Sequence, residues 1–339
     1  MKRMNVAKIT CLIGALSLLL VTGLSNVAVS AEKTYKWKLG QPFTKGTIQY
    51  DLTEDWINRV QTATDGRVKI KHYPGNLLGD YTSQSEAVAS GAQEITIAWP
   101  TTGIAGPGAD VYMLGYVYRN WDDFTEGMLG WMYDLHKEIF KDIDWEVLGT
   151  LPDGFLIVVS NKKFDPMPGP KDVKVRLMPT ELLQLRFKEL GFGTLSMPYS
   201  EFVPALSLGT VDAGGNAAWS EAWYNYKDVI KYIYDAQDMT STMFLLMNKT
   251  LFASLSDSDQ EKISKISEEW SRDNYAAIRK ENEKYRSQLV EHGIEITKYT
   301  QEQWLANGKI SREKEWPFME SRIGKEVMDV IRKNATKLQ

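Results

Sequence analysis

The sequence has one cysteine and three histidines in 339 residues, and this scarcity excludes several kinds of site. Cys11 lies in a leader-like segment, so the remaining chain forms no disulfide, thiolate nucleophile or thiolate metal site. His72, His136 and His292 have no second histidine or carboxylate at metal-ligand spacing. A serine nucleophile elbow and a phosphate-binding loop are also missing. We therefore expect no metal, no cofactor and no enzyme, with a secreted enzyme lacking recognisable catalytic motifs as an alternative.

A surplus of positive charge is missing as well. The formal net charge is -4 and the isoelectric point is near 5.6, with no basic stripe. Nucleic acid is therefore not an expected partner, because its binding depends on clustered lysine and arginine.

Long apolar runs are confined to the first 31 residues. A basic start is followed by the apolar run 9–24 and by small residues ending at Ala31, which is the pattern of a secretory signal. We expect cleavage after Ala31 and a mature chain in the periplasm, with a net charge of about -7 after the loss of three basic residues. The alternative is a retained membrane anchor, for which the run is short and interrupted.

The mature chain shows the periodicities of an α/β protein. Apolar and polar residues alternate over 35–39 and 68–74, which predicts two strands. Apolar residues recur at helical spacing over 51–64, between these strands. That order indicates a parallel α/β unit. Ser256 is placed to cap a long polar helix over residues 256–291.

Arg176 is the strongest candidate for a ligand contact. It lies in the alternating segment Lys174–Leu177, which predicts a strand with both cations on one face. The glycine-containing segment Leu208–Asn216 predicts a turn-rich loop that faces this strand. A guanidinium there would grip a carboxylate through two parallel hydrogen bonds. The alternative is a surface arginine paired with an acidic side chain.

Several segments around Arg176 and elsewhere resemble one family in their order and spacing. They are residues 65–80, 160–162, 174–177, 195–206, 209–216 and 247–256. Together they are similar to the solute-binding proteins of tripartite ATP-independent periplasmic (TRAP) transporters, of the dicarboxylate-binding type. The resemblance covers nearly the whole mature chain.

The resemblance implies a two-lobe periplasmic binding protein fold of α/β class, with a ligand cleft between lobes and a long spanning helix. The expected divisions are a signal peptide at 1–31, lobe I at 32–153 plus 243–280, and lobe II at 154–242 plus 281–339. Hinge closure around a small organic acid and docking on a membrane permease are also implied. We expect a monomer.

Matching the family's motif residue by residue assigns ligand contacts. Arg176 would hold the ligand carboxylate and Asn216 would line the pocket. Tyr199 corresponds to an aromatic ring against the ligand, Trp99 to a pocket wall and Asp80 to a polar residue at the cleft.

Leu156 marks a departure from members that bind highly polar acids, because it stands where those carry a second arginine. A second ligand carboxylate would then be buried unpaired, at a large cost. Trp219 and Trp223 would join Trp99 and Tyr199 as flat walls. We therefore expect an aromatic monocarboxylate, such as indole acetate, indole pyruvate or tryptophan. A four-carbon dicarboxylate, a sugar acid and a small sulfonate remain alternative ligands. For each tryptophan, the alternative to a place in the pocket wall is ordinary packing in the core.

Overall fold

Two β-sheets organise the chain. The computed structural model describes residues 33–165, 171–178, 180–197 and 199–338, so the expected signal peptide at 1–31 lies outside the described residues. Residues 36–339 form one compact unit. The first sheet has the order β2-β1-β3-β10-β4. Its strands are β1 (Tyr35–Gly40), β2 (Val68–Tyr73), β3 (Ile95–Ala98), β4 (Trp145–Phe155) and β10 (Thr240–Asn248).

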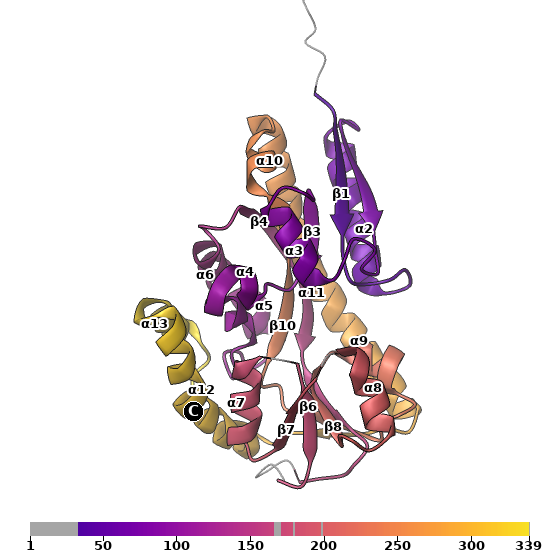
Figure 1. Ribbon diagram of the computed structural model, residues 1–339, viewed down its shortest axis with the longest axis vertical. Coiled ribbons are helices and arrows are strands. Elements are labelled where there is room, and N and C mark those ends of the chain that lie inside the picture. Colours follow the sequence, from indigo (N-terminus) through magenta and orange to yellow (C-terminus); the bar gives the residue numbers. More distant parts are fainter. Residues whose placement is uncertain (1–32, 166–170, 179, 198, 339) are drawn as a thin grey trace, which may run out of the picture. The chain divides into compact units, whose positions relative to one another are not determined.

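The strand order of the first sheet explains its almost continuous burial. β1 pairs with β3 in parallel, whereas β10 runs antiparallel between β3 and β4, as Figure 1 shows. Every residue of β10 is buried. A strand with neighbours on both sides and helices over its faces favours apolar side chains, and this accounts for the run from Met243 to Met247.

The second sheet has the order β11-β9-β5-β8-β6-β7. β5 is antiparallel to both of its neighbours, whereas β8, β6 and β7 run parallel. The strands are β5 (Ile157–Ser160), β6 (Lys174–Leu177), β7 (Gly193–Ser196), β8 (Ala213–Ala217), β9 (Tyr232–Asp235) and β11 (Glu295–Lys298).

The expected turn-rich loop at 208–216 is wrong in its second half, because Ala213–Ala217 is an internal strand. A Cβ on Gly214 would come within 2.3 Å of the Phe202 ring, and one on Gly215 within 2.5 Å of the Phe187 ring. The two glycines therefore serve the close approach of aromatic rings to both faces of the sheet, rather than a turn.

Helices cover the sheets and connect their strands. Residues 121–139 form two of them, with Asn120 capping the first and Gly130 between them. Residues 222–226 form a π-helix, a rare form that is often found at functional sites. The helices are α2 (Ile48–Ala63), α3 (Tyr81–Ala89), α4 (Thr102–Ala105), η2 (Gly106–Met113), α5 (Trp121–Met128), α6 (Trp131–Ile139), α7 (Glu181–Glu189), α8 (Tyr199–Ser207), α9 (Trp219–Glu221), η3 (Ala222–Tyr226), α10 (Lys249–Ala253), α11 (Asp257–Glu291), α12 (Gln301–Ile323) and α13 (Lys325–Asn334).

The chain passes between the sheets at three places. β4 of the first sheet continues into β5 of the second through Leu156, and β9 leads back to β10 through residues 236–239. The Leu156 amide donates to the Met239 carbonyl at 2.9 Å, which joins these two crossings. α11 is the third: it contacts β4 and also α9, before the chain enters β11. The expected lobe boundaries stay a prediction.

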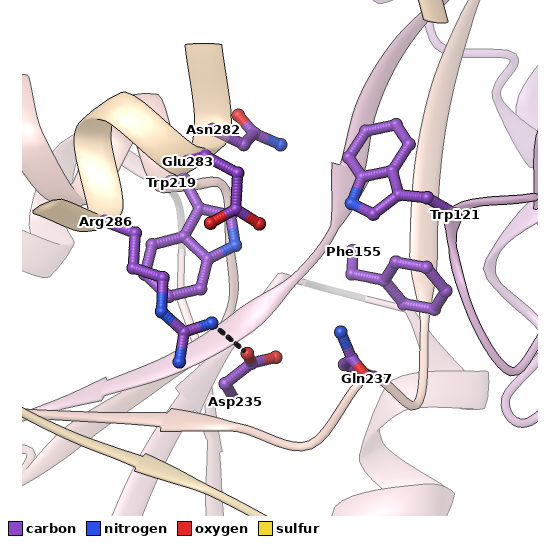
Figure 2. A pocket seen from close by; sticks show the side chains of 8 residues that line it. All are labelled: Trp121, Phe155, Trp219, Asp235, Gln237, Asn282, Glu283 and Arg286. Atoms are coloured by element: carbon purple, nitrogen blue, oxygen red, sulfur yellow. Dashed lines mark hydrogen bonds and ion pairs between the residues drawn. The ribbon is translucent and has the colours of Figure 1, made fainter. Parts of the chain in front are cut away.

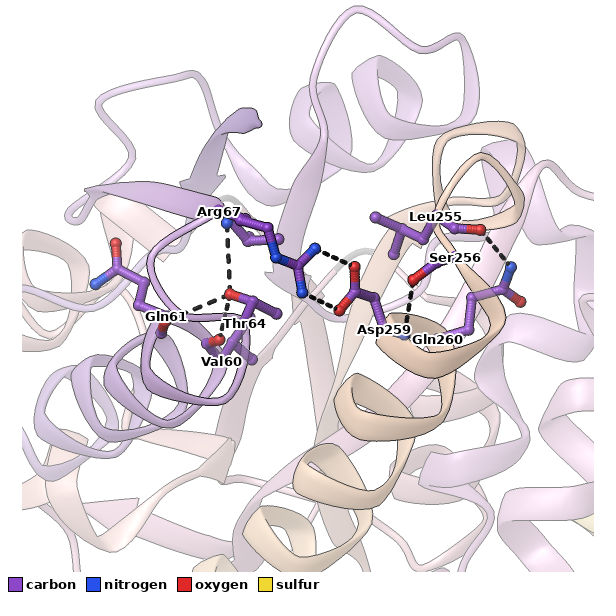
Figure 3. A network of polar contacts seen from close by, with 9 residues as sticks. Val60, Gln61, Thr64, Arg67, Leu255, Ser256, Asp259 and Gln260 are labelled. Atoms are coloured by element: carbon purple, nitrogen blue, oxygen red, sulfur yellow. Dashed lines mark hydrogen bonds and ion pairs between the residues drawn. The ribbon is translucent and has the colours of Figure 1, made fainter. Parts of the chain in front are cut away.

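α11 begins as predicted, with the Ser256 hydroxyl accepting from the Asp259 amide. Arg67, after α2, donates to both carboxylate oxygens of Asp259 at 2.6 and 2.7 Å (Figure 3). Trp56 of α2 donates to the Ser267 hydroxyl at 2.9 Å, and Trp270 donates to the Leu52 carbonyl at 2.7 Å. These contacts join α2, and the turn after it, to the first half of α11. In the part of the chain that is described, no helix is both long and apolar enough to span a membrane.

Candidate functional site

Arg176 lies on β6, an internal strand of the second sheet, and contacts a backbone carbonyl and an aromatic ring. Its side chain is almost completely buried, at 6% exposure. Its Nε donates to the Met197 carbonyl at 3.1 Å, and the guanidinium lies over the Phe202 ring at 5.6 Å. Because Gly214 lets that ring approach the strand, the glycine helps to position the arginine. The surface alternative for Arg176 is thereby excluded.

Asn216 lies near the end of β8, beside the strand that carries Arg176. Its backbone has φ +82°, a left-handed conformation that asparagine tolerates better than most residues. Its amide nitrogen contacts the Met178 sulfur at 3.6 Å, and its Oδ1 is buried with no hydrogen-bond donor among the described residues. Strained backbone and an unsatisfied buried acceptor both carry a free-energy cost, and both are typical of binding sites.

Trp99 follows β3 and is half-buried against aromatic neighbours. The Tyr81 ring meets it edge-on at 5.5 Å, and the Phe43 ring lies at 6.0 Å. Its indole nitrogen donates to Asp153 Oδ2 at 3.2 Å and to the Ser241 hydroxyl oxygen at 2.9 Å. Trp99 is therefore fixed in orientation by the ends of β4 and β10.

Asp153 was not found by the sequence analysis, and no local pattern distinguishes it from other aspartates near a glycine. It is 5% exposed, and Ser241 donates to its Oδ2 at 2.7 Å. Burial raises its pKa to about 6, although the hydrogen bonds from Ser241 and Trp99 act in the opposite direction. The first sheet thus contributes a buried carboxyl group at the nitrogen-bearing edge of the Trp99 ring.

Glu221 is a second carboxyl that sequence reasoning missed. It ends the short α9, where its Oε2 accepts from the Ala218 amide at 2.9 Å. Burial raises its pKa to about 7, and the charge of Asp153 adds to this, whereas the Ala218 bond and the charge of Arg176 oppose it. Burial also raises the pKa of Tyr81, which the Arg176 charge lowers. The charge of Arg176 on β6 therefore acts on Tyr81 of α3 and on Glu221 of α9, and the charge of Asp153 on β4 acts on Glu221.

Trp219 of α9 lines a small pocket, shown in Figure 2. Arg286 lies over its ring at 5.5 Å and pairs with Asp235 at 3.0 Å. Asp235 is 2% exposed, burial raises its pKa, and its Oδ1 has no hydrogen-bond partner among the described residues. The pocket is lined by Trp121, Phe155, Trp219, Asp235, Gln237, Asn282, Glu283 and Arg286. Its walls therefore come from the segments that pass between the sheets.

The other predicted site residues have varied positions. Asp80 is exposed and caps α3, accepting from the amide and the hydroxyl of Ser83 at 2.8 Å each, and these bonds lower its pKa. Leu156 is buried at the crossing between the sheets. Trp223 contacts Lys227 and His292. Tyr199 begins α8, and its side chain lies outside the described residues.

Histidine takes no part in a metal centre within the described residues, where no group of three or more potential ligands is found. His136 is completely buried and contacts the Met132 carbonyl through Nδ1 at 2.7 Å. Burial lowers its pKa to about 4, so this histidine is neutral at physiological pH.

A family model described as bacterial extracellular solute-binding protein, family 7, matches residues 39–312. The chain belongs to this family. Its members are the solute-binding proteins of TRAP transporters, so the chain is a binding component of a transporter and not an enzyme. The resemblance inferred from Arg176 and its surrounding segments is confirmed.

Similar proteins agree with this assignment. The sialic acid-binding periplasmic protein of Vibrio cholerae is 22% identical over 80% of this chain and 85% of its own length. The 2,3-diketo-L-gulonate-binding periplasmic protein of Escherichia coli is 22% identical over 82% of this chain and 85% of its own length. The structure of a TRAP periplasmic solute-binding protein from Desulfovibrio salexigens with bound orotic acid matches with a TM-score of 0.80 at 19% identity. The match covers 89% of this chain and 97% of that protein. The two-lobe TRAP binding-protein fold is therefore confirmed.

Proposed function

We propose that this TRAP solute-binding protein captures a small organic acid with one carboxylate and an aromatic body, and delivers it to a membrane permease for uptake. The observation that carries the proposal is Arg176, an arginine 6% exposed on an internal strand and oriented by Met197 and Phe202. The bidentate geometry of guanidinium suits a carboxylate.

The aromatic part of the ligand is assigned to the side of Trp99. Trp99 is only half-buried, and its nitrogen is already bonded to Asp153 and Ser241, so its polar edge is satisfied. What such a ring offers a ligand is its face, which favours a flat apolar group. Leu156 supplies no second cation, which favours one carboxylate over two. Orotic acid, bound by the Desulfovibrio salexigens protein, is a carboxylate on a planar ring and fits the same description.

A sugar acid is the second candidate. Two relatives carry names that specify binding of sialic acid and of 2,3-diketo-L-gulonate. The polar groups near Trp99, namely Tyr81, Asp153 and Ser241, would suit hydroxyl groups. A four-carbon dicarboxylate and a small sulfonate are weaker candidates, because the structure offers them no comparable feature.

The cellular setting completes the proposal. Known relatives are periplasmic, and the basic and apolar start of the chain supports export with cleavage after Ala31. Lobe boundaries near residues 153, 242 and 280 agree with the crossings at Leu156, at 236–239 and along α11. A monomer that closes around its ligand and then meets the permease is the working state we propose.

A thermal-shift screen of residues 32–339 tests the ligand class. The panel comprises aromatic monocarboxylates, sugar acids, four-carbon dicarboxylates and small sulfonates. A ligand at about one hundred times its dissociation constant stabilises the native state by about 2.7 kcal/mol, which is easily seen as a rise in melting temperature. We expect a shift with aromatic monocarboxylates. A shift with sugar acids alone would replace our proposal by the second candidate.

The same screen on Arg176→Ala and Arg176→Lys tests the clamp. Alanine should abolish the shift, and lysine should weaken it strongly because the forked geometry is lost. Arg279→Ala is the control, since Arg279 is half-exposed on α11 and pairs with Asp122 at the surface. A normal ligand shift in Arg176→Ala would refute the role of Arg176.

A further inference from the structure

We infer that Asp153 and Ser241 are positioning residues for ligand selection: they hold the Trp99 indole in one orientation, so that its face is ready for a flat ligand before the ligand arrives. This inference rests on the proposed function and deepens it, because it names two side chains that act on the ligand through a third. Neither Asp153 nor Ser241 lies in a segment that carries the family resemblance.

Three side chains close a triangle of hydrogen bonds. Trp99 Nε1 donates to the Ser241 hydroxyl at 2.9 Å and to Asp153 Oδ2 at 3.2 Å, and Ser241 donates to the same Oδ2 at 2.7 Å. Indole has a single N–H group, so any rotation of the ring breaks both of its bonds together. The rings of Tyr81 and Phe43 border the indole at 5.5 and 6.0 Å between centroids. The ring is therefore ordered by contacts within the protein.

A β-bulge brings Asp153 to this triangle. On β4, Pro152 pairs with Thr242 and Gly154 pairs with Ser241, so the intervening Asp153 has no register partner on β10. A bulge of this kind changes the direction of a side chain and is over-represented next to functional sites. The Asp153 side chain is directed into the protein, where it is 5% exposed and reaches the indole nitrogen. Regular pairing of the two strands would not give it this position.

The bulge is itself held by α11. Asn282 Nδ2 donates to the Asp153 carbonyl at 2.9 Å. Gly154 has φ +98°, and a Cβ there would come within 2.6 Å of both the Asn282 amide nitrogen and the Trp121 ring. Glycine is required at this position for its backbone angle and for the space. The acceptor for the indole is thus fixed by the backbone and by the spanning helix, and binding does not bear the entropic cost of ordering the ring.

A double-mutant cycle separates positioning from general damage to the fold. Ser241→Ala removes one acceptor and the bridge to Asp153, whereas Trp99→Phe keeps a flat ring without an N–H group. By titration calorimetry, Ser241→Ala should weaken binding of indole-3-acetate about fivefold in the parent, because the ring must then be ordered on binding. In the Trp99→Phe background it should have almost no effect. Equal losses in both backgrounds would overturn the inference and leave the proposed function standing. Failure of the parent to bind any aromatic monocarboxylate would overturn both.

A matched control and a conservative variant complete the test. Ser271 is also a buried hydroxyl that accepts from one amide, that of Thr150 at 2.9 Å, and donates to one carbonyl, that of Ser267 at 2.7 Å. Ser271→Ala should therefore bind indole-3-acetate like the parent. Asp153→Asn keeps a carbonyl oxygen for both donors and should stay within about twofold of the parent, whereas Asp153→Ala should behave like Ser241→Ala. An equal loss in Ser271→Ala and Ser241→Ala would show a structural effect and overturn the inference.

The order of the ring can also be measured without a ligand. The Trp99 indole N–H signal is identified in nuclear magnetic resonance spectra as the one that Trp99→Phe lacks. In the parent its proton should exchange slowly with water, and Ser241→Ala should accelerate that exchange about tenfold or more. Equally fast exchange in the parent and in Ser241→Ala would overturn the inference, whatever the ligand.

Discussion

At the scale of single residues, the buried carboxyl groups make the stability of this protein depend on pH. Asp153 is removed from water and has three hydrogen-bonding neighbours, and burial raises its pKa to about 6. Because the folded protein holds this proton more tightly than the unfolded chain, the contribution of Asp153 to stability is largest below pH 4. It is lost as the pH rises from about 4 through 6.

Asp153→Asn should therefore change stability in a pH-dependent way. At pH 7 the variant should be as stable as the parent or more stable, by at most roughly 3 kcal/mol, because about two pKa units of penalty are removed. At pH 4 the advantage should shrink towards zero. Urea unfolding at the two pH values measures the difference, and Asp122→Asn on the exposed start of α5 serves as the control. A loss of stability that is equal at both pH values would contradict this account.

At the scale of secondary-structure elements, the attachment of α11 to the strands and helices of the first sheet depends on polar contacts at its first turns. Asp259 is 2% exposed, and its hydrogen bonds to Arg67 lower its pKa. The pair also joins the turn after α2 to the start of α11 (Figure 3). Removal of one partner leaves a buried charge without compensation, which is far more costly than the loss of a surface pair.

Arg67→Leu should destabilise the protein by about 3–5 kcal/mol at pH 7. The stability contributed by the ionised Asp259 is present above its unfolded pKa and is lost as the pH falls through the lowered native value, so the defect should be smaller near pH 3. Arg279→Leu is the matched control, since Arg279 bonds Asp122 at 2.7 Å but both side chains are at least half-exposed. Its loss should stay below about 1 kcal/mol. Equal losses in the two variants, measured by urea unfolding, would refute the argument.

At the scale of the whole molecule, three segments pass between the two sheets, and the pocket around Trp219 is lined by all three: Phe155 from β4, Gln237 from the return to β10, and Asn282, Glu283 and Arg286 from α11 (Figure 2). Gln237 adopts φ +49° in the second of these. A left-handed residue in a short connection constrains its path, so changes of backbone angle during closure should concentrate here.

Ligand binding should therefore make the mature protein more compact. A compact monomer of this length has a radius of gyration of about 19 Å, and small-angle X-ray scattering should show a decrease when a ligand from the thermal-shift screen is added. Arg176→Ala in the presence of the same ligand is the control and should show no decrease. An unchanged radius in the wild type at saturating ligand would contradict closure, and a radius well above this value would contradict the monomer.

Much of the fold followed from local patterns. Alternation located β1, β2 and β6, the Ser256 cap located the start of α11, and ordered segments around Arg176 identified the family. These features depend on neighbours in the sequence, whose backbone geometry and side-chain spacing repeat with a fixed period. The strand at Ala213–Ala217 was mistaken for a loop because glycines usually indicate turns. Here Gly214 and Gly215 make room for the rings of Phe202 and Phe187, which come from other parts of the chain.

Only part of the candidate site could be predicted from such local patterns. Arg176 and Asn216 belong to a motif and were named from it, whereas Asp153 and Glu221 belong to none. Their raised pKa values depend on removal from water, which hydrogen bonds to Asp153 and to Glu221 only partly oppose. Burial is a property of the folded chain, so only the tertiary structure decided which carboxyl groups are removed from water.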